Sequence, residues 1–147
     1  MKLVIANTNG AGRSYVESST ELSEGRIVSV WDGGLDDIAA RIAAMESDPH
    51  HTFLPPPGGV KWVVSTFPPP GEEERYGYRS MGKHLTRTVD FDHFLSGELN
   101  CVLDEETVEL DEGDFIMVRA ANHEWVNRGT TPARLLVILH QPSRPPA

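Results

Sequence analysis

The sequence predicts one all-β domain, a barrel or sandwich of short antiparallel strands accompanied by a single short helix. Strand-like segments recur along the chain and are separated by turns of Gly, Asp and Pro, which is typical of such folds. Only one segment has a convincing helical periodicity. The chain has 147 residues with no internal repeat and no obvious linker, so we expect a single domain.

The expected strands extend from the N-terminus to the C-terminal end. In order, they are Leu3–Ala6, Ser14–Glu17, Arg26–Trp31, Val60–Phe67, His84–Leu95, Leu99–Leu103, Thr107–Leu110, Phe115–Val118 and Arg134–Leu139. Two proline clusters, Pro55–Pro57 and Pro68–Pro70, bracket the strand Val60–Phe67. Because proline cannot donate a hydrogen bond in the middle of a sheet, we expect both clusters to form stiff crossovers over the barrel mouth.

The predicted helix is the segment GLDDIAARIAAM, residues 34–45. Its apolar residues recur at helical spacing and form one stripe: Leu35, Ile38, Ile42 and Met45. Asp36 and Asp37 lie in the first turn, where the helix dipole favours negative charge. A helix with a single apolar stripe can cover only one neighbouring surface.

Charge and cysteine content restrict the possible partners and the compartment. The formal net charge is −9 and the basic residues are scattered, which argues against a nucleic-acid partner. No apolar run is long enough to cross a bilayer, so we expect no membrane partner. The single cysteine, Cys101, excludes an internal disulfide, lies in register with buried apolar positions and favours a cytoplasmic location.

The segment HLTRTVDFDHFLSGE, residues 84–98, separates most of its polar and apolar side chains with a period of two. The even positions are His84, Thr86, Thr88, Asp90, Asp92 and Phe94, and the odd positions are Leu85, Arg87, Val89, Phe91, His93 and Leu95. One interpretation is an ordinary half-buried strand whose even face meets water. The other is that the even face lines a cavity. Such a row would need hydrogen bonds, metal or water, because burying an unpaired polar group costs roughly 1–3 kcal/mol.

The C-terminal half resembles the cupin superfamily, whose members are small jelly-roll barrels also called double-stranded β-helices. The first cupin motif reads roughly G-x5-H-x-H-x3-E-x6-G, and its positions correspond here to His84, Asp90 and Gly97. The second reads roughly G-x5-P-x-G-x2-H-x3-N, and its positions correspond to Gly113, His123 and Asn127. In a cupin, the first motif faces into the barrel, so the resemblance implies that the even face lines the lumen.

The resemblance also implies how the chain is organised. We expect a single cupin domain over residues 1–147, with N-terminal strands, the helix and the proline-rich crossovers in residues 1–76. The core motifs then occupy residues 77–140, and residues 141–147 form a frayed tail.

Cupins with complete motifs commonly hold Fe, Mn, Ni or Zn through three histidines and one glutamate. In this chain Thr86 takes the place of the second histidine and Asp90 replaces the glutamate. The expected metal ligands are therefore His84, Asp90 and His123, a two-histidine, one-carboxylate set that suits a divalent ion with open positions. The alternative is a hydrogen-bonded polar cluster that holds no metal.

The same face supplies the candidate catalytic and substrate-binding residues. The candidate catalytic residues are His123, Asp90 and Asp92, because two nearby carboxylates can shift each other's pKa and act as an acid–base pair. An alternative for Asp92 is that a bulge turns it toward solvent. The candidate substrate-binding residues are Thr86, Thr88, Phe94, Trp125 and Asn127, with Trp125 forming either a flat wall for an aromatic ligand or simple barrel core.

These observations favour a small cytoplasmic enzyme that acts on an organic molecule, aromatic or polyketide-like, in the barrel lumen. The chemistry would be dehydration, isomerisation or oxygenation, through a divalent metal or through His/Asp acid–base catalysis. The alternative is a non-catalytic small-molecule-binding cupin with a degenerate metal site. We also expect a homodimer, because the strand Arg134–Leu139 is apolar on both faces and its outer face needs a cover.

Overall fold

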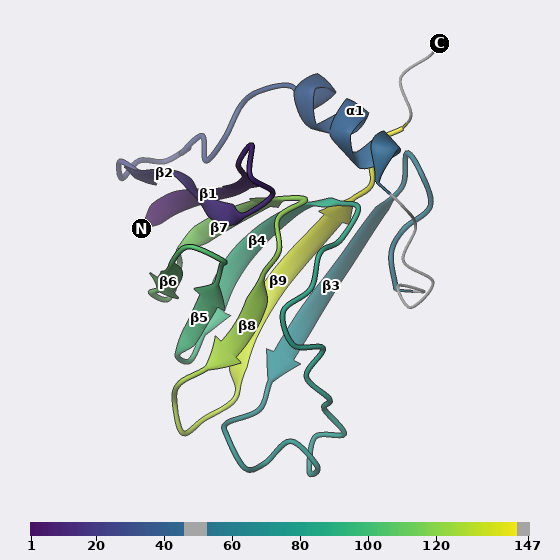
Figure 1. The fold of residues 1–147 in the computed structure, drawn as a ribbon. Coiled ribbons are helices and arrows are strands. Elements are labelled where there is room, and N and C mark those ends of the chain that lie inside the picture. The colour runs from purple at the N-terminus through teal and green to yellow at the C-terminus, as the bar shows by residue number, and fades with distance from the viewer. Residues whose placement is uncertain (46–52, 144–147) are drawn as a thin grey trace.

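The structure, a computed structural model, describes residues 1–45 and 53–143, in which strands form two sheets that face each other (Figure 1). The larger sheet has the strand order β2-β1-β7-β4-β9-β3 and the smaller one the order β6-β5-β8. The strands are β1 (Lys2–Thr8), β2 (Ser14–Glu21), β3 (Val60–Phe67), β4 (Val89–Ser96), β5 (Leu99–Val102), β6 (Thr107–Leu110), β7 (Phe115–Arg119), β8 (Glu124–Asn127) and β9 (Ala133–His140), and the helix is α1 (Asp36–Ala44). This is the predicted all-β jelly-roll fold with N-terminal strands and one short helix.

The core lies between the two sheets and follows the alternation of the strands. In β9, Leu135 and Leu139 are buried on the inner face, while Leu136 and Ile138 lie half-buried on the outer face. Both faces of this strand are therefore apolar, as the sequence predicts. Cys101 is fully buried on the inner face of the small sheet, which confirms its apolar surroundings.

The N-terminal hairpin extends the large sheet at one edge. Strand β1 pairs in parallel with β7, from Leu3 opposite Phe115 to Ala6 opposite Val118, and β2 pairs antiparallel with β1. The sequence also predicts a strand at Arg26–Trp31, and this prediction is wrong. That segment crosses the outer face of the sheet instead, where the ring of Trp31 packs 5.8 Å from that of Phe91, because Val30 and Trp31 pack there against the buried apolar cluster that contains Leu3.

Two further boundaries differ from the prediction. The strand expected at His84–Leu95 begins only at Val89, and His84 is joined to the small sheet by an isolated bridge to His123. Strand β8 is absent from the predicted list, although residues 123–127 read in strand register. Half of its four residues are polar, and pairing with β5 rather than a hydrophobic run makes them a strand.

The chain after β9 stays attached for a short distance. Gln141 is buried; its N–H donates to the carbonyl of Gly59 at 3.1 Å, and its carbonyl accepts from the N–H of Gly58 at 2.7 Å. The expected frayed tail therefore does not begin at residue 141, and residues 144–147 lie outside the described part of the chain.

Helix α1 lies at the top of the large sheet in the view of Figure 1 and buries the predicted stripe. Ile38 and Ile42 are buried in a cluster with Leu3, Val89 and Met117, which belong to three strands of the large sheet. Within the described residues, no helix is long and apolar enough to cross a membrane.

Replacing Ile42 with alanine should destabilise the fold, since its side chain is 1% exposed and removal leaves a cavity under the helix. We expect Ile42→Ala to lower the free energy of unfolding by about 2–5 kcal/mol in denaturant titrations. The matched control is Ile27→Ala, because Ile27 is 82% exposed and should change stability by less than about 0.5 kcal/mol. Equal effects would contradict the packing of α1.

Candidate functional site

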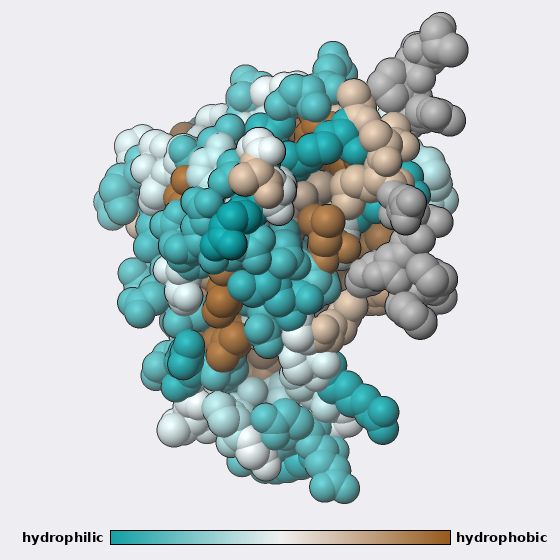
Figure 2. All heavy atoms as spheres, in the orientation of Figure 1, coloured by the Kyte–Doolittle hydropathy of each residue, from teal (hydrophilic) through white to brown (hydrophobic). Residues whose placement is uncertain are grey.

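A cavity of about 310 Å³ lies between the two sheets at the end where β3, β8 and β9 come together. In Figure 1 the chain between β3 and β4 runs across this end of the barrel, and residues 78–82 of that connection line the cavity. The face turned toward the viewer in Figure 2 is largely hydrophilic, with apolar residues visible in a few separate places. Of the predicted site residues, the cavity is lined by His84, Thr86, Asp90, His123 and Trp125.

The two cavity histidines are joined through their backbones. The N–H of His84 donates to the carbonyl of His123, the N–H of His123 donates to the carbonyl of His84, and both distances are 2.9 Å. Their rings lie with centroids 4.5 Å apart. Each Nδ1 lies near a backbone carbonyl, that of Gly82 at 2.9 Å for His84 and that of Ala121 at 2.8 Å for His123.

These carbonyl contacts fix the protonation of the rings. A carbonyl oxygen can only accept, so Nδ1 of each histidine must carry the proton. Burial, with a smaller contribution from His84, lowers the pKa of His123 to about 4. His123 is therefore neutral at pH 7, and its Nε2 is a hydrogen-bond acceptor.

Asp90 is buried and connected to two threonines. Its Oδ1 accepts a hydrogen bond from Thr88 Oγ1 at 2.6 Å, and Thr88 Oγ1 lies 2.9 Å from Thr86 Oγ1. When Thr88 donates its only proton to Asp90, Thr86 must donate to Thr88, so the three groups form a directed chain. Burial raises the pKa of Asp90 to about 7, although the Thr88 hydrogen bond lowers it. Both the protonated and the ionised form of Asp90 are therefore populated near neutral pH.

Asp92 lies on the same face of β4 but deeper, and it does not contact the cavity. It is 3% exposed, and neither carboxylate oxygen has a hydrogen-bond partner. Burial, and then the charge of Asp90, raises the pKa of Asp92 well above the ordinary value. The alternative in which a bulge turns Asp92 toward solvent is therefore wrong, and the carboxyl is held protonated.

Aromatic side chains form one wall of the cavity. The ring of Trp125 lies 5.8 Å from that of His123 and 6.2 Å from that of Phe67, and Phe67 meets Tyr78 edge-on at 6.0 Å. Phe67 and Tyr78 were not among the residues predicted from sequence. Tyr78 comes from the irregular connection before β4, where no periodicity indicates direction. The interpretation of Trp125 as a cavity wall is supported by these contacts.

The remaining predicted residues lie outside the cavity. Phe94 is fully buried in the core between the sheets. Asn127 uses its amide to fix the turn after β8: Nδ2 donates to the carbonyls of Phe67 and Thr131, and Oδ1 accepts from the N–H of Gly129. Thr88 acts through Asp90 rather than from the cavity wall. Phe94 and Asn127 therefore stabilise the fold and do not line the cavity.

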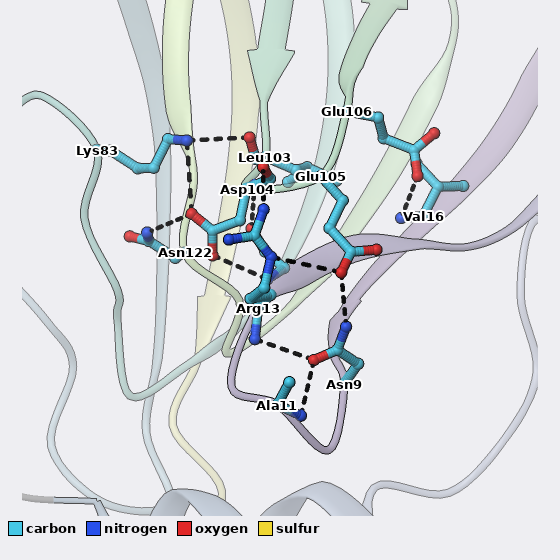
Figure 3. A network of polar contacts seen from close by, with 11 residues as sticks. Asn9, Ala11, Arg13, Val16, Lys83, Leu103, Asp104, Glu105, Glu106 and Asn122 are labelled. Atoms are coloured by element: carbon cyan, nitrogen blue, oxygen red, sulfur yellow. Dashed lines mark hydrogen bonds and ion pairs between the residues drawn. The ribbon is translucent and has the colours of Figure 1, made fainter.

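Asp104 ties together the segments that carry the two histidines (Figure 3). Its Oδ1 accepts from Asn122 Nδ2 at 3.0 Å and lies 3.5 Å from Lys83 Nζ, and its Oδ2 accepts from the N–H of Ser14 at 2.9 Å. The hydrogen bond from the Ser14 backbone is the main cause that lowers the pKa of Asp104 to about 2. Lys83 and Asn122 directly precede His84 and His123, so this ionised carboxylate positions both.

The expected metal ligands do not form a binding set. Among the described residues, no three His, Cys, Asp or Glu side chains are grouped so that they could hold a metal ion. Two imidazoles face each other, and Oδ1 of Asp90 accepts a hydrogen bond from Thr88. The donor set present in this chain therefore does not fit a metal held by His84, Asp90 and His123.

The comparison with protein families agrees with the fold and the two motifs. Residues 69–139 match the cupin domain family. The match covers just under half of the chain and identifies this region as a cupin domain. No curated protein matches the sequence significantly.

Three of the solved structures that resemble the chain align with just over half of it. A conserved protein of unknown function from Streptococcus pyogenes is 18% identical over 57% of this chain and 66% of its own, with a TM-score of 0.45. A cupin protein from Bacteroides fragilis is 17% identical over 56% of this chain and 66% of its own, also with a TM-score of 0.45. The Cupin_2 domain of an XRE family transcriptional regulator from Enterobacter cloacae is 18% identical over 58% of this chain and 73% of its own, with a TM-score of 0.35. The chain thus spans about two thirds of the first two proteins.

The buried Asp92 should make stability depend on pH. An unfolded aspartate ionises near 3.8, whereas the raised pKa of folded Asp92 keeps its proton, so the folded state binds more protons and loses stability as pH rises. We expect Asp92→Asn, which does not titrate, to gain stability relative to the wild type between pH 4 and pH 8 in urea titrations. The exposed control Asp111→Asn should show a constant difference. A pH-independent difference for Asp92→Asn would contradict a buried, protonated carboxyl.

Proposed function

We propose that this protein is a small-molecule enzyme that transfers protons by acid–base chemistry in its barrel cavity. The observation that carries the proposal is Asp90, a buried carboxyl with a pKa raised to about 7 that lines a cavity with an aromatic wall. A general acid or base is most effective when its pKa lies near the working pH. A cupin domain with such a cavity also supports small-molecule binding as the coarser function.

The cavity favours a small, flat organic ligand. Its volume of about 310 Å³ lies at the lower end of the range for small-molecule sites, roughly 300–1,000 Å³. Trp125, Phe67 and Tyr78 offer ring faces and edges, which suit an aromatic or polyketide-like molecule. The polar groups His84, Asp90 and His123 line the same cavity, where they can orient a carbonyl or hydroxyl group.

The polar residues have different roles in this proposal. Asp90 comes from the large sheet, and its proton is the one that moves. His123 precedes β8 of the small sheet, and its neutral ring accepts a hydrogen bond at Nε2 from a substrate hydroxyl. The chain from Thr86 through Thr88 holds the Asp90 carboxylate in place when it is ionised.

The reaction class follows from a single carboxyl that can give or take a proton. The Asp90 carboxylate removes a proton from the carbon beside a substrate carbonyl, and the electron pair of that bond moves into an enolate. Protonated Asp90 then returns the proton to another carbon, which gives an isomer, or to a leaving hydroxyl, which departs as water and gives a dehydration product. Asp92 stays protonated behind Asp90 and therefore does not repel the enolate.

A metal-dependent version, including oxygenation with Fe, Mn, Ni or Zn, is the competing form of this enzyme. Its support is the pair His84 and His123, whose rings are held close together by the backbone bridge. It lacks a third ligand among the described residues. A non-catalytic binding protein is the other alternative, and it shares the same cavity and aromatic wall. The single buried cysteine is compatible with the cytoplasmic location that we propose.

Replacing Asp90 with asparagine should separate binding from chemistry. A panel of small aromatic ketones is screened by ligand-observed NMR, and those that bind are incubated with the protein in D2O. We expect the wild type to exchange protons beside the ketone carbonyl for deuterium, and Asp90→Asn to lose at least about 100-fold of this rate while it still binds. The exposed control Asp111→Asn should exchange like the wild type. Binding without exchange in the wild type would favour the non-catalytic alternative.

Removing metal should leave the exchange reaction intact. Protein treated with a strong chelator and then dialysed is compared with untreated protein, with elemental analysis of both. We expect the exchange rate to be unchanged, because Asp90 needs no ion to hold its proton near neutral pH. Loss of exchange that is restored by one of Fe, Mn, Ni or Zn would replace the acid–base proposal with the metal-dependent one.

A further inference from the structure

A second, smaller cavity adjoins the candidate site and shares its aromatic wall. Its volume is about 180 Å³, and Phe67, Tyr78 and Trp125 line both cavities. Ser80 and Glu124 also line both. These side chains come from the end of β3, from β8 and from the connection between β3 and β4. A ligand bound against the shared wall can therefore contact both cavities at once.

The charged side chains of the smaller cavity are all negative. Glu73 and Glu124 line it, and none of the described residues around it is a lysine, arginine or histidine. Arg79 lines the larger cavity but not the smaller one. The Glu73 carboxylate accepts a hydrogen bond from the N–H of Gly71 at 2.9 Å. Glu124 is half-buried, and its carboxylate has no hydrogen-bond or ion-pair partner in the described part of the chain.

The charges of both glutamates reach the aromatic wall. Burial is the largest cause that raises the pKa of Tyr78; a hydrogen bond with Ser80 lowers it, and the charges of Glu124 and Glu73 raise it further. Two negative charges that disfavour a phenolate stabilise a positive charge placed beside the same ring. The electrostatics of the shared wall therefore favour a cation.

The wall also presents ring faces in several directions. The Phe67 ring lies 6.2 Å from that of Trp125 at an interplanar angle of 44°, and 6.0 Å from that of Tyr78 at 72°. Trp125 and Tyr78 are half-buried, so part of each side chain remains accessible. Ring faces attract ammonium groups within about 6 Å of the ring centroid, and groups of inclined rings recognise quaternary ammonium ligands.

We propose that the smaller cavity binds the ammonium group of an organic cation whose uncharged part occupies the larger cavity. Glu73 and Glu124 balance the positive charge, while Trp125 and Tyr78 contact its methyl or methylene groups. The net charge of −9 adds to this preference, because it attracts cations to the protein and repels anions. The substrate class, an amine that also carries the reacting carbonyl, rests on the proposed function. Binding of the ammonium group does not.

The test compares choline with 3,3-dimethyl-1-butanol, which has nearly the same shape and no charge. Both are titrated into the full chain, and binding is followed by ligand-observed NMR. We expect choline to bind roughly tenfold more tightly, because only its ammonium group interacts favourably with the ring faces and the carboxylates.

Two substitutions remove the negative charge of the cavity and nearly preserve side-chain size. We expect Glu124→Gln to lose most of the preference for choline, and the double variant with Glu73→Gln to lose the rest. The matched control is Glu72→Gln, because Glu72 lies in the same connection, pairs with Arg75 at 3.2 Å and lines neither cavity. This control should bind both probes like the wild type. Circular dichroism shows whether each variant is folded.

The proposal is overturned if the wild type binds the two probes equally or binds neither. It is also overturned if the folded double variant keeps the full preference for choline. Deuterium exchange into neutral aromatic ketones tests Asp90 separately, because those ketones carry no ammonium group. Exchange without a preference for choline would exclude the ammonium site and leave proton transfer in place. A preference for choline without exchange would support the ammonium site in a non-catalytic binding protein.

Discussion

The candidate site depends on the ionised carboxylate of Asp104. This residue lies in the turn between β5 and β6, yet it binds Ser14 of the N-terminal hairpin and both residues that precede the cavity histidines. Its surroundings are further held by Arg13, which donates to the Asp104 carbonyl at 3.0 Å and pairs with Glu105. This connection adds to the backbone bridge between His84 and His123 in joining the two histidine segments. The N-terminal hairpin therefore contributes to the site without reaching the cavity.

The burial of Asp90 and Asp92 lowers the stability of the fold, and the packing around them must offset this cost. Asp90 recovers part of that cost through the hydrogen bond from Thr88, whereas Asp92 has no partner for either oxygen. Such a group has no packing advantage over an apolar side chain, and unsatisfied burial is destabilising. Strained or unsatisfied groups of this kind collect at functional sites. This is the physical reason to interpret the face as a site rather than as core.

Sequence periodicity predicted the alternation of β4 and β9 because the burial of one strand face leaves a period of two in the residues themselves. Periodicity failed where distant parts of the chain decide which strands pair or where a segment crosses the sheet. The segment Arg26–Trp31 has a strand-like composition, but Val30 and Trp31 pack across the face of the sheet against the cluster that contains Leu3. Strand β8 has only four residues, half of them polar, and forms because β5 offers it hydrogen bonds.

The candidate site was likewise predictable where local sequence spacing determines it, and not where distant parts of the chain do. His84, Asp90 and His123 follow from the spacing of the two motifs, but spacing does not show whether their donor atoms converge. Phe67 and Tyr78 reach the cavity from β3 and from an irregular connection, so neither belongs to a motif. Asp104 lies in an acidic turn whose sequence is ordinary, and only the folded chain shows that it contacts Lys83 and Asn122.

Strand β4 links the cavity to the outer face, because one of its faces points into the barrel and the other forms part of the outer surface of the sheet. Asp90 and Asp92 point inward, while the alternating residues Phe91 and His93 point outward to the apolar outer face of the large sheet. A shift in the register of β4 by one residue would place the carboxyls outside and the aromatic ring inside, which would destroy both faces at once. The register that creates the acid–base cavity is therefore the same one that creates the apolar outer surface. The cavity of the proposed enzyme and the apolar outer surface are thus two consequences of one alternating strand.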